Sequence, residues 1–266
     1  MASVEDIRAD MVAEQEDLDA LVAGLDERDW ARPTPAEGWS VGDQIGHLAY
    51  FDAAAVRALT TPARFRAEVE AVLTQGTDFT EHHLDEHRAM SSRDLLHSWR
   101  RGRQDLLRAV VAADPGVRVP WYGPPMSLAS FVSARLMEAW AHGQDVADGV
   151  GAVRAPTDRL RHVAHVGVRS RPFSYTVRGR QPPPEPVSVE LVAPSGGRWD
   201  WDAEGSVAVV KGSALGFCLV VTQRRHLDDT DVVTEGPRAR EWMEIAQAFA
   251  GPPGPGRRPG QFAPLG

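Results

Sequence analysis

Residues 127–148 have the sequence SLASFVSARLMEAWAHGQDVAD, and this stretch decides the fold class of the first half of the chain. Its apolar residues recur at helical spacing, which predicts an inward-facing helix that ends at Gly149. Glu138 and His142 are four residues apart on the same face, so their Cβ atoms lie about 5–6 Å apart. The stripe consists of Leu128, Phe131, Val132, Arg135, Glu138, Ala139, His142 and Asp145.

Periodic apolar residues predict further helices before this stretch. Three of these helices begin at a serine followed three residues later by an aspartate, which indicates capped helix starts at Ser3, Ser40 and Ser91. The expected helical regions are 4–25, 40–59, 61–90 and 91–113. Long helices with short connections predict an antiparallel four-helix bundle over residues 1–150.

The pattern changes in the second half of the chain. Thr157–Arg169 is predicted to be a shorter helix within a bridging segment, residues 151–172. A smaller α+β domain is expected over 173–250, and it closes with a helix over Pro237–Ala250. Five prolines after residue 250 predict a flexible tail over 251–266. The expected strands are Ser174–Val177, Val187–Val192, Trp199–Trp201, Val207–Val210 and Phe217–Thr222.

Composition excludes several classes of protein. The net charge is −8, and residues 1–90 carry 19 acidic against 7 basic residues, so a basic nucleic-acid-binding face is not expected. No apolar run reaches the ~18 residues of a membrane helix. Cys218 is the single cysteine, which excludes an intrachain disulfide and, because apolar residues flank it, predicts an inert buried thiol. The acidic N-terminus is unlike a secretory signal, and we expect a cytoplasmic protein.

Two histidine groups are weak candidates for metal binding. His83 and His87 are four residues apart, and they share a helix face if this charged segment is helical. A solvated helix face or loop is the better interpretation of that segment. His162 and His165 have a spacing of three residues within an apolar helix, and a structural role is favoured for both.

A third group combines Glu138 and His142 with His47, which lies among apolar residues of the second predicted helix. One histidine from one helix and a Glu-x-x-x-His pair from another are able to meet in the core of a bundle. Buried charges are costly unless they are paired or bind a metal. From the spacing alone, separate polar residues satisfied within the core explain the pattern equally well.

Two motifs add a resemblance to a known family. Residues 37–48, EGWSVGDQIGHL, followed by Phe51-Asp52, resemble the N-terminal motif of the DinB-like superfamily. Residues 138–146, EAWAHGQDV, are similar to the second metal motif of its mycothiol-dependent maleylpyruvate isomerase branch. The resemblance implies that His47, Glu138 and His142 bind a metal on a four-helix bundle, and that the C-terminal domain is similar to sterol carrier proteins. Residues 216–230, GFCLVVTQRRHLDDT, resemble an uncharacterised actinobacterial metal-binding subfamily more than the isomerase itself.

The resemblance also implies a function. Three protein ligands leave a coordination position open, which is typical of catalytic zinc, although nickel, cobalt, manganese and iron accept the same donors. The thiol mycothiol is the implied cosubstrate, and we expect transfer or isomerisation of a small electrophilic substrate. The alternatives are a thiol-independent metal hydrolase or lyase, and a metal-containing protein that binds a small ligand. Neither the oligomeric state nor the electrophile is predicted.

Further residues are candidates for roles beside the metal. Arg135 is expected to bind a substrate carboxylate or to pair with a glutamate. Asp145 is expected to orient His142 or a bound water, or to lie exposed at the helix end. The resemblance implies that an arginine from the C-terminal domain reaches the metal cleft, and Arg225 or Arg224 is the candidate, with a basic surface cluster as the alternative. Trp39 and Trp140 are expected to pack in the core.

Overall fold

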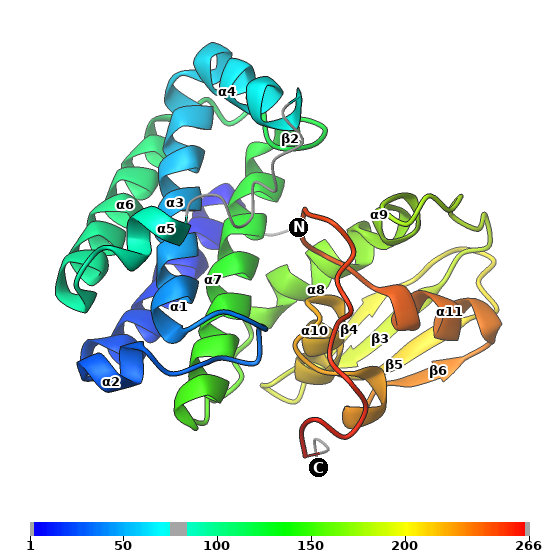
Figure 1. Ribbon diagram of the computed structural model, residues 1–266. Coiled ribbons are helices and arrows are strands. Elements are labelled where there is room, and N and C mark those ends of the chain that lie inside the picture. Colours follow the sequence, from blue (N-terminus) through cyan, green and yellow to red (C-terminus); the bar gives the residue numbers. More distant parts are fainter. Residues whose placement is uncertain (1–2, 75–83, 264–266) are drawn as a thin grey trace. The chain divides into compact units, whose positions relative to one another are not determined.

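The computed structural model describes residues 3–74 and 84–263. The chain forms two compact units, Met1–Arg154 and Ala155–Gly266 (Figure 1). The first unit is built from helices and one short two-stranded ribbon, and the second combines a sheet with helices. The predicted fold class, a helical bundle followed by a smaller α+β domain, is confirmed.

Four long helices form the body of the first unit, and shorter elements connect them (Figure 1). Ser3 and Ser40 cap the first and second long helices in capping boxes with Asp6 and Asp43, and Ser91 caps the third. The elements are α1 (Val4–Ala23), α2 (Glu27–Trp30), α3 (Val41–Thr60), α4 (Pro62–Thr74), α5 (Leu84–Arg88), α6 (Ser92–Ala112), β1 (Arg118–Val119), β2 (Met126–Ser127) and α7 (Leu128–Val150).

Helix α3 is the central element of the bundle because it packs against both α6 and α7. Its apolar side chains Ile45 and Leu48 are almost fully buried in a core that also contains Trp99 of α6 and Val146 of α7. His47 lies between these two core positions in the sequence. The packing that stabilises the bundle therefore also fixes the helix that carries this histidine.

The predicted end of α7 at Gly149 is wrong by two residues. The helix continues to Val150, and Gly151 ends it in the left-handed conformation with φ 71°. A Cβ at position 149 would lie 3.2 Å from the carbonyl oxygen of Pro33. Gly149 thus provides close packing for the segment that leads into α3, and it does not stop the helix.

The second unit contains a four-stranded sheet in the order β4-β3-β5-β6. Strand β3 pairs antiparallel with β4 and parallel with β5, and β5 pairs antiparallel with β6. Val189 opposes Val210 in the central pair, and both side chains are fully buried. The elements are α8 (Leu160–Arg169), α9 (Arg171–Thr176), β3 (Ser188–Val192), β4 (Arg198–Trp201), β5 (Val209–Ser213), α10 (Ala214–Val221), the 3-10 turn η1 (Leu227–Asp229), β6 (Val233–Glu235) and α11 (Pro237–Ile245).

Two predicted strands are helices in the structure. Ser174–Val177 overlaps α9, whose second residue is Pro172, and proline is accepted in the first turn of a helix. Phe217–Thr222 overlaps α10, which Ser213 caps by accepting a hydrogen bond from the Gly216 amide at 2.9 Å. Nearly every side chain of α10 is buried, so its apolar run has no periodicity that distinguishes a helix from a strand.

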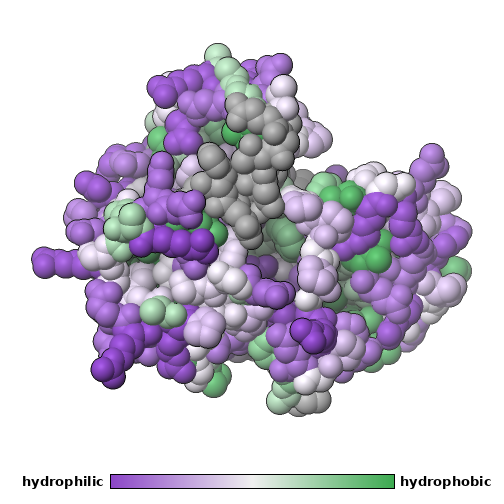
Figure 2. All heavy atoms as spheres, in the orientation of Figure 1, coloured by the Kyte–Doolittle hydropathy of each residue, from purple (hydrophilic) through white to green (hydrophobic). Residues whose placement is uncertain are grey.

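The segment after Gly251 was expected to be a flexible tail, and its described part contacts the rest of the second unit. The Gly260 amide donates to Asp229 Oδ1 at 2.7 Å, and the ring of Phe262 lies 3.6 Å from Arg225 Cζ. On the face drawn in Figure 2, hydrophilic side chains predominate and hydrophobic ones form small separate groups. Among the described residues, no helix combines the length and the apolar character needed to cross a bilayer.

His87 has a packing role that the sequence did not indicate. It lies on α5 against Gly46 of α3, where a Cβ would meet the His87 Cβ at 2.8 Å. The contact requires glycine on α3, one residue before His47. The other histidine of this candidate pair, His83, lies outside the described residues.

We predict that Gly46→Ala destabilises the protein by about 1–3 kcal/mol, because the new methyl group overpacks the contact between α3 and α5. Gly42→Ala on the same helix is the matched control, since its Cβ meets the nearest atom, the Trp30 carbonyl oxygen, at an ordinary 3.5 Å. Urea denaturation followed by circular dichroism measures both free energies of unfolding. Equal stability of the two variants would contradict the prediction.

Candidate metal centre

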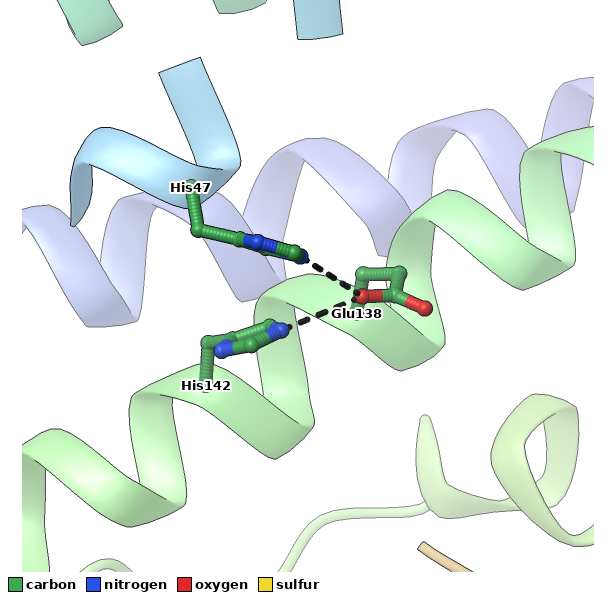
Figure 3. A group of neighbouring side chains, drawn as sticks. All are labelled: His47, Glu138 and His142. Carbon is green, nitrogen blue, oxygen red and sulfur yellow. Dashed lines mark hydrogen bonds and ion pairs between the residues drawn. The ribbon is translucent and has the colours of Figure 1, made fainter. Parts of the chain in front are cut away.

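Three side chains from two helices converge in the first unit. His47 comes from α3, and Glu138 and His142 come from α7 (Figure 3). His47 Nε2 lies 3.8 Å, and His142 Nε2 lies 3.2 Å, from the same Glu138 oxygen, Oε2. One potential ligand atom from each residue lies within 4.8 Å of the others. Both histidines are 8% exposed.

This geometry fits a small divalent cation. Two donors that are each about 2.1 Å from a tetrahedral zinc ion lie roughly 3.4 Å apart. The two nitrogen–oxygen distances fall on either side of that value, so a shift of a few tenths of an ångström accommodates an ion. Two imidazoles and a carboxylate form a nitrogen and oxygen donor set that accepts zinc and neighbouring transition metals.

A hydrogen-bonded chain fixes the tautomer of His142. The Thr34 hydroxyl donates its proton to the Trp39 carbonyl oxygen at 2.9 Å, so it accepts from the Gln44 amide Nε2, also at 2.9 Å. Gln44 Oε1 then faces His142 Nδ1 at 2.6 Å. Because a carbonyl oxygen only accepts, Nδ1 carries a proton, and Nε2 is the ring nitrogen that faces Glu138, where it donates to the carboxylate or, without its proton, binds an ion. The sequence analysis did not single out Gln44, although it precedes His47 by three residues and so lies on the same side of α3.

Glu138 remains ionised inside this cluster. Burial alone would raise the pKa of its carboxyl group, but hydrogen bonds with His142 and His47 and the charge of Arg135 hold that pKa well below its usual value. Arg135 Nη2 lies 3.8 Å from Glu138 Oε2. An ionised carboxylate is the form that binds a metal ion.

Aromatic rings enclose the two histidines. The ring centroid of Trp39 lies 5.1 Å from that of His47 and 6.1 Å from that of His142. The ring centroid of Phe51, one turn further along α3, lies 4.5 Å from that of His47. Trp39 was expected to pack in the core, whereas it is only half-buried and lies beside both candidate ligands. Trp140, by contrast, is buried as expected.

A second buried acid lies on the same helix as His47. Asp52 is 3% exposed, and burial raises the pKa of its carboxyl group to about 6, against the opposing charge of Arg135. Asp52 Oδ2 and Arg135 Nη1 are buried atoms without a hydrogen-bond partner among the described residues. Arg135 therefore balances negative charge on both α3 and α7 and retains an unused donor.

The other candidate residues lie elsewhere or have different surroundings. Asp145 is buried on α7 and is not exposed at a helix end. In the second unit, His165 accepts a hydrogen bond from Trp201 Nε1 at 3.2 Å, in agreement with a structural role. Arg224 and Arg225 follow α10, and their Nη1 atoms donate to the carbonyl oxygens of Thr222 and Arg224 at 2.6 and 2.7 Å.

Comparison with known proteins identifies relatives over most of the chain. Two uncharacterized proteins of Mycobacterium tuberculosis, MT0041 of strain CDC 1551 / Oshkosh and Rv0036c of strain ATCC 25618 / H37Rv, are each 48% identical over 249 residues. The alignment covers 94% of this chain and 97% of each relative.

Solved structures and a family model agree on the fold. The crystal structure of the mycothiol-dependent maleylpyruvate isomerase matches with a TM-score of 0.59 and 17% identity, over 90% of this chain and 99% of the isomerase. A mutant of that enzyme matches with a TM-score of 0.58. The model of the mycothiol maleylpyruvate isomerase N-terminal domain matches residues 11–147, which is about half of the chain and includes all three converging side chains. The chain therefore belongs to the family of the mycothiol maleylpyruvate isomerase N-terminal domain.

Proposed function

We propose that this chain is a metal-dependent enzyme that uses a low-molecular-weight thiol, mycothiol or a close analogue, as the nucleophile. Its reaction is the transfer of that thiol to a small electrophilic substrate, or the isomerisation of the substrate. Membership of an enzyme family named for a mycothiol-dependent isomerase supports the thiol, and the cluster of His47, Glu138 and His142 supports the metal.

The number of donors is the observation that carries the proposal. Within residues 3–74 and 84–263, the group of side chains placed to hold a metal ion consists of three residues, and His87 has a separate packing role against Gly46. Three protein ligands leave a position open for an exogenous molecule, as in catalytic zinc sites, whereas structural sites are closed by four. Zinc is the proposed ion, with nickel, cobalt, manganese and iron as chemically acceptable substitutes.

A divalent cation held by these residues would favour the thiolate form of a bound thiol, which is otherwise mostly protonated at neutral pH because its pKa is about 8.5. The residues of the chain prepare the site for this chemistry. Gln44 keeps His142 in the tautomer that presents Nε2, and Trp39 and Phe51 limit the access of water to the two imidazoles.

The reaction then requires that the thiolate sulfur form a bond to an electrophilic carbon of the substrate while a bond of that carbon breaks. In an activated alkene this is the carbon–carbon π bond, whose electron pair moves to the conjugated carbonyl oxygen. In an epoxide it is a carbon–oxygen bond, whose electron pair stays on the oxygen, which then takes a proton from water. If that carbon–sulfur bond later breaks, the thiol is recovered and the substrate is isomerised. If the bond remains, the product is a thioether conjugate. Arg135 is 5% exposed, lies beside Glu138 and has an unused donor at Nη1, so we assign it the binding of an anionic oxygen of the substrate. Asp145 is proposed to support His142 from the same helix.

We predict that the purified protein binds about one divalent ion per chain and that His142→Ala removes it, because two remaining donors hold zinc poorly. His165→Ala is the control, since this histidine belongs to the second unit and bonds to Trp201. Elemental analysis by mass spectrometry gives the metal content. Full occupancy in the His47→Ala/His142→Ala double variant would contradict the proposed ligand set.

Gln44→Ala is expected to weaken metal affinity about 10- to 100-fold without abolishing it, because the hydrogen bond that orients His142 is lost while all three ligands remain. Gln144→Ala on α7 provides the comparison, as the Gln144 amide bonds to Asp148 instead. Competition with a chromogenic chelator measures both affinities. An unchanged metal affinity in Gln44→Ala would contradict the prediction, because the hydrogen bond to His142 would then have no effect on metal binding.

Turnover of electrophiles is expected to require both thiol and metal. Arg135→Gln should reduce kcat/KM about 10- to 150-fold, because a charge-assisted contact of about 1.5–3 kcal/mol is lost. Activated alkenes and epoxides are assayed with metal-loaded and chelated protein, with and without mycothiol. Turnover without any thiol would favour a hydrolase or lyase. Ligand binding without turnover under every condition would favour a carrier.

A further inference from the structure

Two aromatic side chains lie partly exposed in the connection between α6 and α7. The short ribbon of β1 and β2 pairs Val119 with Met126 and holds the turn that carries Trp121 and Tyr122. Both rings are half-buried, whereas the neighbouring Phe65 and Phe131 are buried almost completely. A tryptophan and a tyrosine held at the surface by a fixed turn are typical of a binding surface for an apolar group.

A cavity of about 480 Å³ opens against these rings. Its volume falls within the range of roughly 300–1,000 Å³ that is common for small-molecule sites. Trp121, Tyr122 and Gly123 form one wall, and Arg66, Val69 and Glu70 of α4 form the other. Among the described lining residues, the two charged side chains, Arg66 and Glu70, have opposite signs.

A series of packed aromatic rings connects the cavity wall to the candidate metal centre. The ring centroid of Phe51 lies 4.5 Å from that of His47. It lies 5.6 Å from the centroid of Tyr122 and 6.2 Å from that of Trp121. Arg135 Cζ lies 5.3 Å from the Trp121 ring centroid. A molecule with its polar end near Arg135 is therefore close to the aromatic wall.

We infer that Trp121 and Tyr122 form a subsite for an aromatic group of the substrate. This inference rests on the proposed function, because it assumes that the reacting end of the substrate lies near His47, Glu138 and His142. Phe65 stacks on Trp121 with centroids 5.6 Å apart, so a substrate ring would contact the part of Trp121 that remains exposed, together with the ring of Tyr122. The preferred substrate is then an aryl-bearing electrophile with an anionic oxygen, and a short aliphatic acid lacks the group that this subsite recognises.

The test compares cinnamate with crotonate, two probes with the same unsaturated carboxylate that differ in a phenyl or a methyl group. Isothermal titration calorimetry is performed on the full chain, both metal-loaded and metal-free, and without thiol. The wild-type protein is expected to bind cinnamate at least tenfold more tightly than crotonate. Trp121→Ala should reduce this preference to about threefold or less, while Trp121→Phe should keep most of it.

Controls separate recognition from folding. Tyr122→Leu provides a second variant that removes one ring, and circular dichroism with thermal unfolding checks that each variant is folded. Val207→Ala in the second unit should leave both affinities unchanged, since Val207 is 90% exposed there. Equal affinity of the wild-type protein for the two probes would overturn the inference, as would an unchanged preference in folded Trp121→Ala. Because the readout is binding in the absence of thiol and turnover, failure of the proposed reaction leaves this result interpretable.

Discussion

The arrangement of the first unit depends on one largely enclosed negative charge, the carboxylate of Glu138, whose side chain is 17% exposed. A carboxylate inside a helical bundle is costly unless positive or hydrogen-bonding groups surround it. His142 one turn further along α7, His47 on α3 and the guanidinium of Arg135 supply those groups. The contact between α3 and α7 is therefore polar at this level, whereas Ile45 and Leu48 make the packing apolar around it. The same requirement for charge compensation that constrains the two helices also provides a donor set for a cation.

The features that the sequence predicts correctly are local ones. Serines three residues before aspartates mark the starts of α1, α3 and α6, because a serine cap uses only neighbouring residues. Helical spacing combined with motif resemblance also brings together His47, Glu138 and His142, which converge in the structure, and their binding of a metal stays a prediction. The failures have tertiary causes. The run around Cys218 is buried on every side of α10, so burial removes the periodicity that distinguishes helix from strand.

The residues around the triad are harder to predict because chain segments distant in sequence bring them together. Gln44 meets His142 across 98 positions, and it is oriented by Thr34, which precedes it by ten. Trp39 lies in a loop, where no periodicity indicates the direction of a side chain. Gly149 illustrates the same limit, since glycine commonly ends helices but here allows the backbone of Pro33 to approach. Local patterns identify side chains suited to a chemistry, and tertiary packing determines which groups assist them.

The confinement of all three donors to the first unit has a thermodynamic consequence. A ligand that binds only the folded state adds its binding free energy to the stability of the part it binds, by about 4 kcal/mol at a free concentration of 1,000 times Kd. His47, Glu138 and His142 lie within Met1–Arg154, so occupancy by a cation would protect that unit against unfolding and leave Ala155–Gly266 without direct gain. The supply of metal would then change the stability of the first unit directly, but not that of the second unit. Under metal starvation, the helical half would lose this protection, whereas the second unit has none to lose.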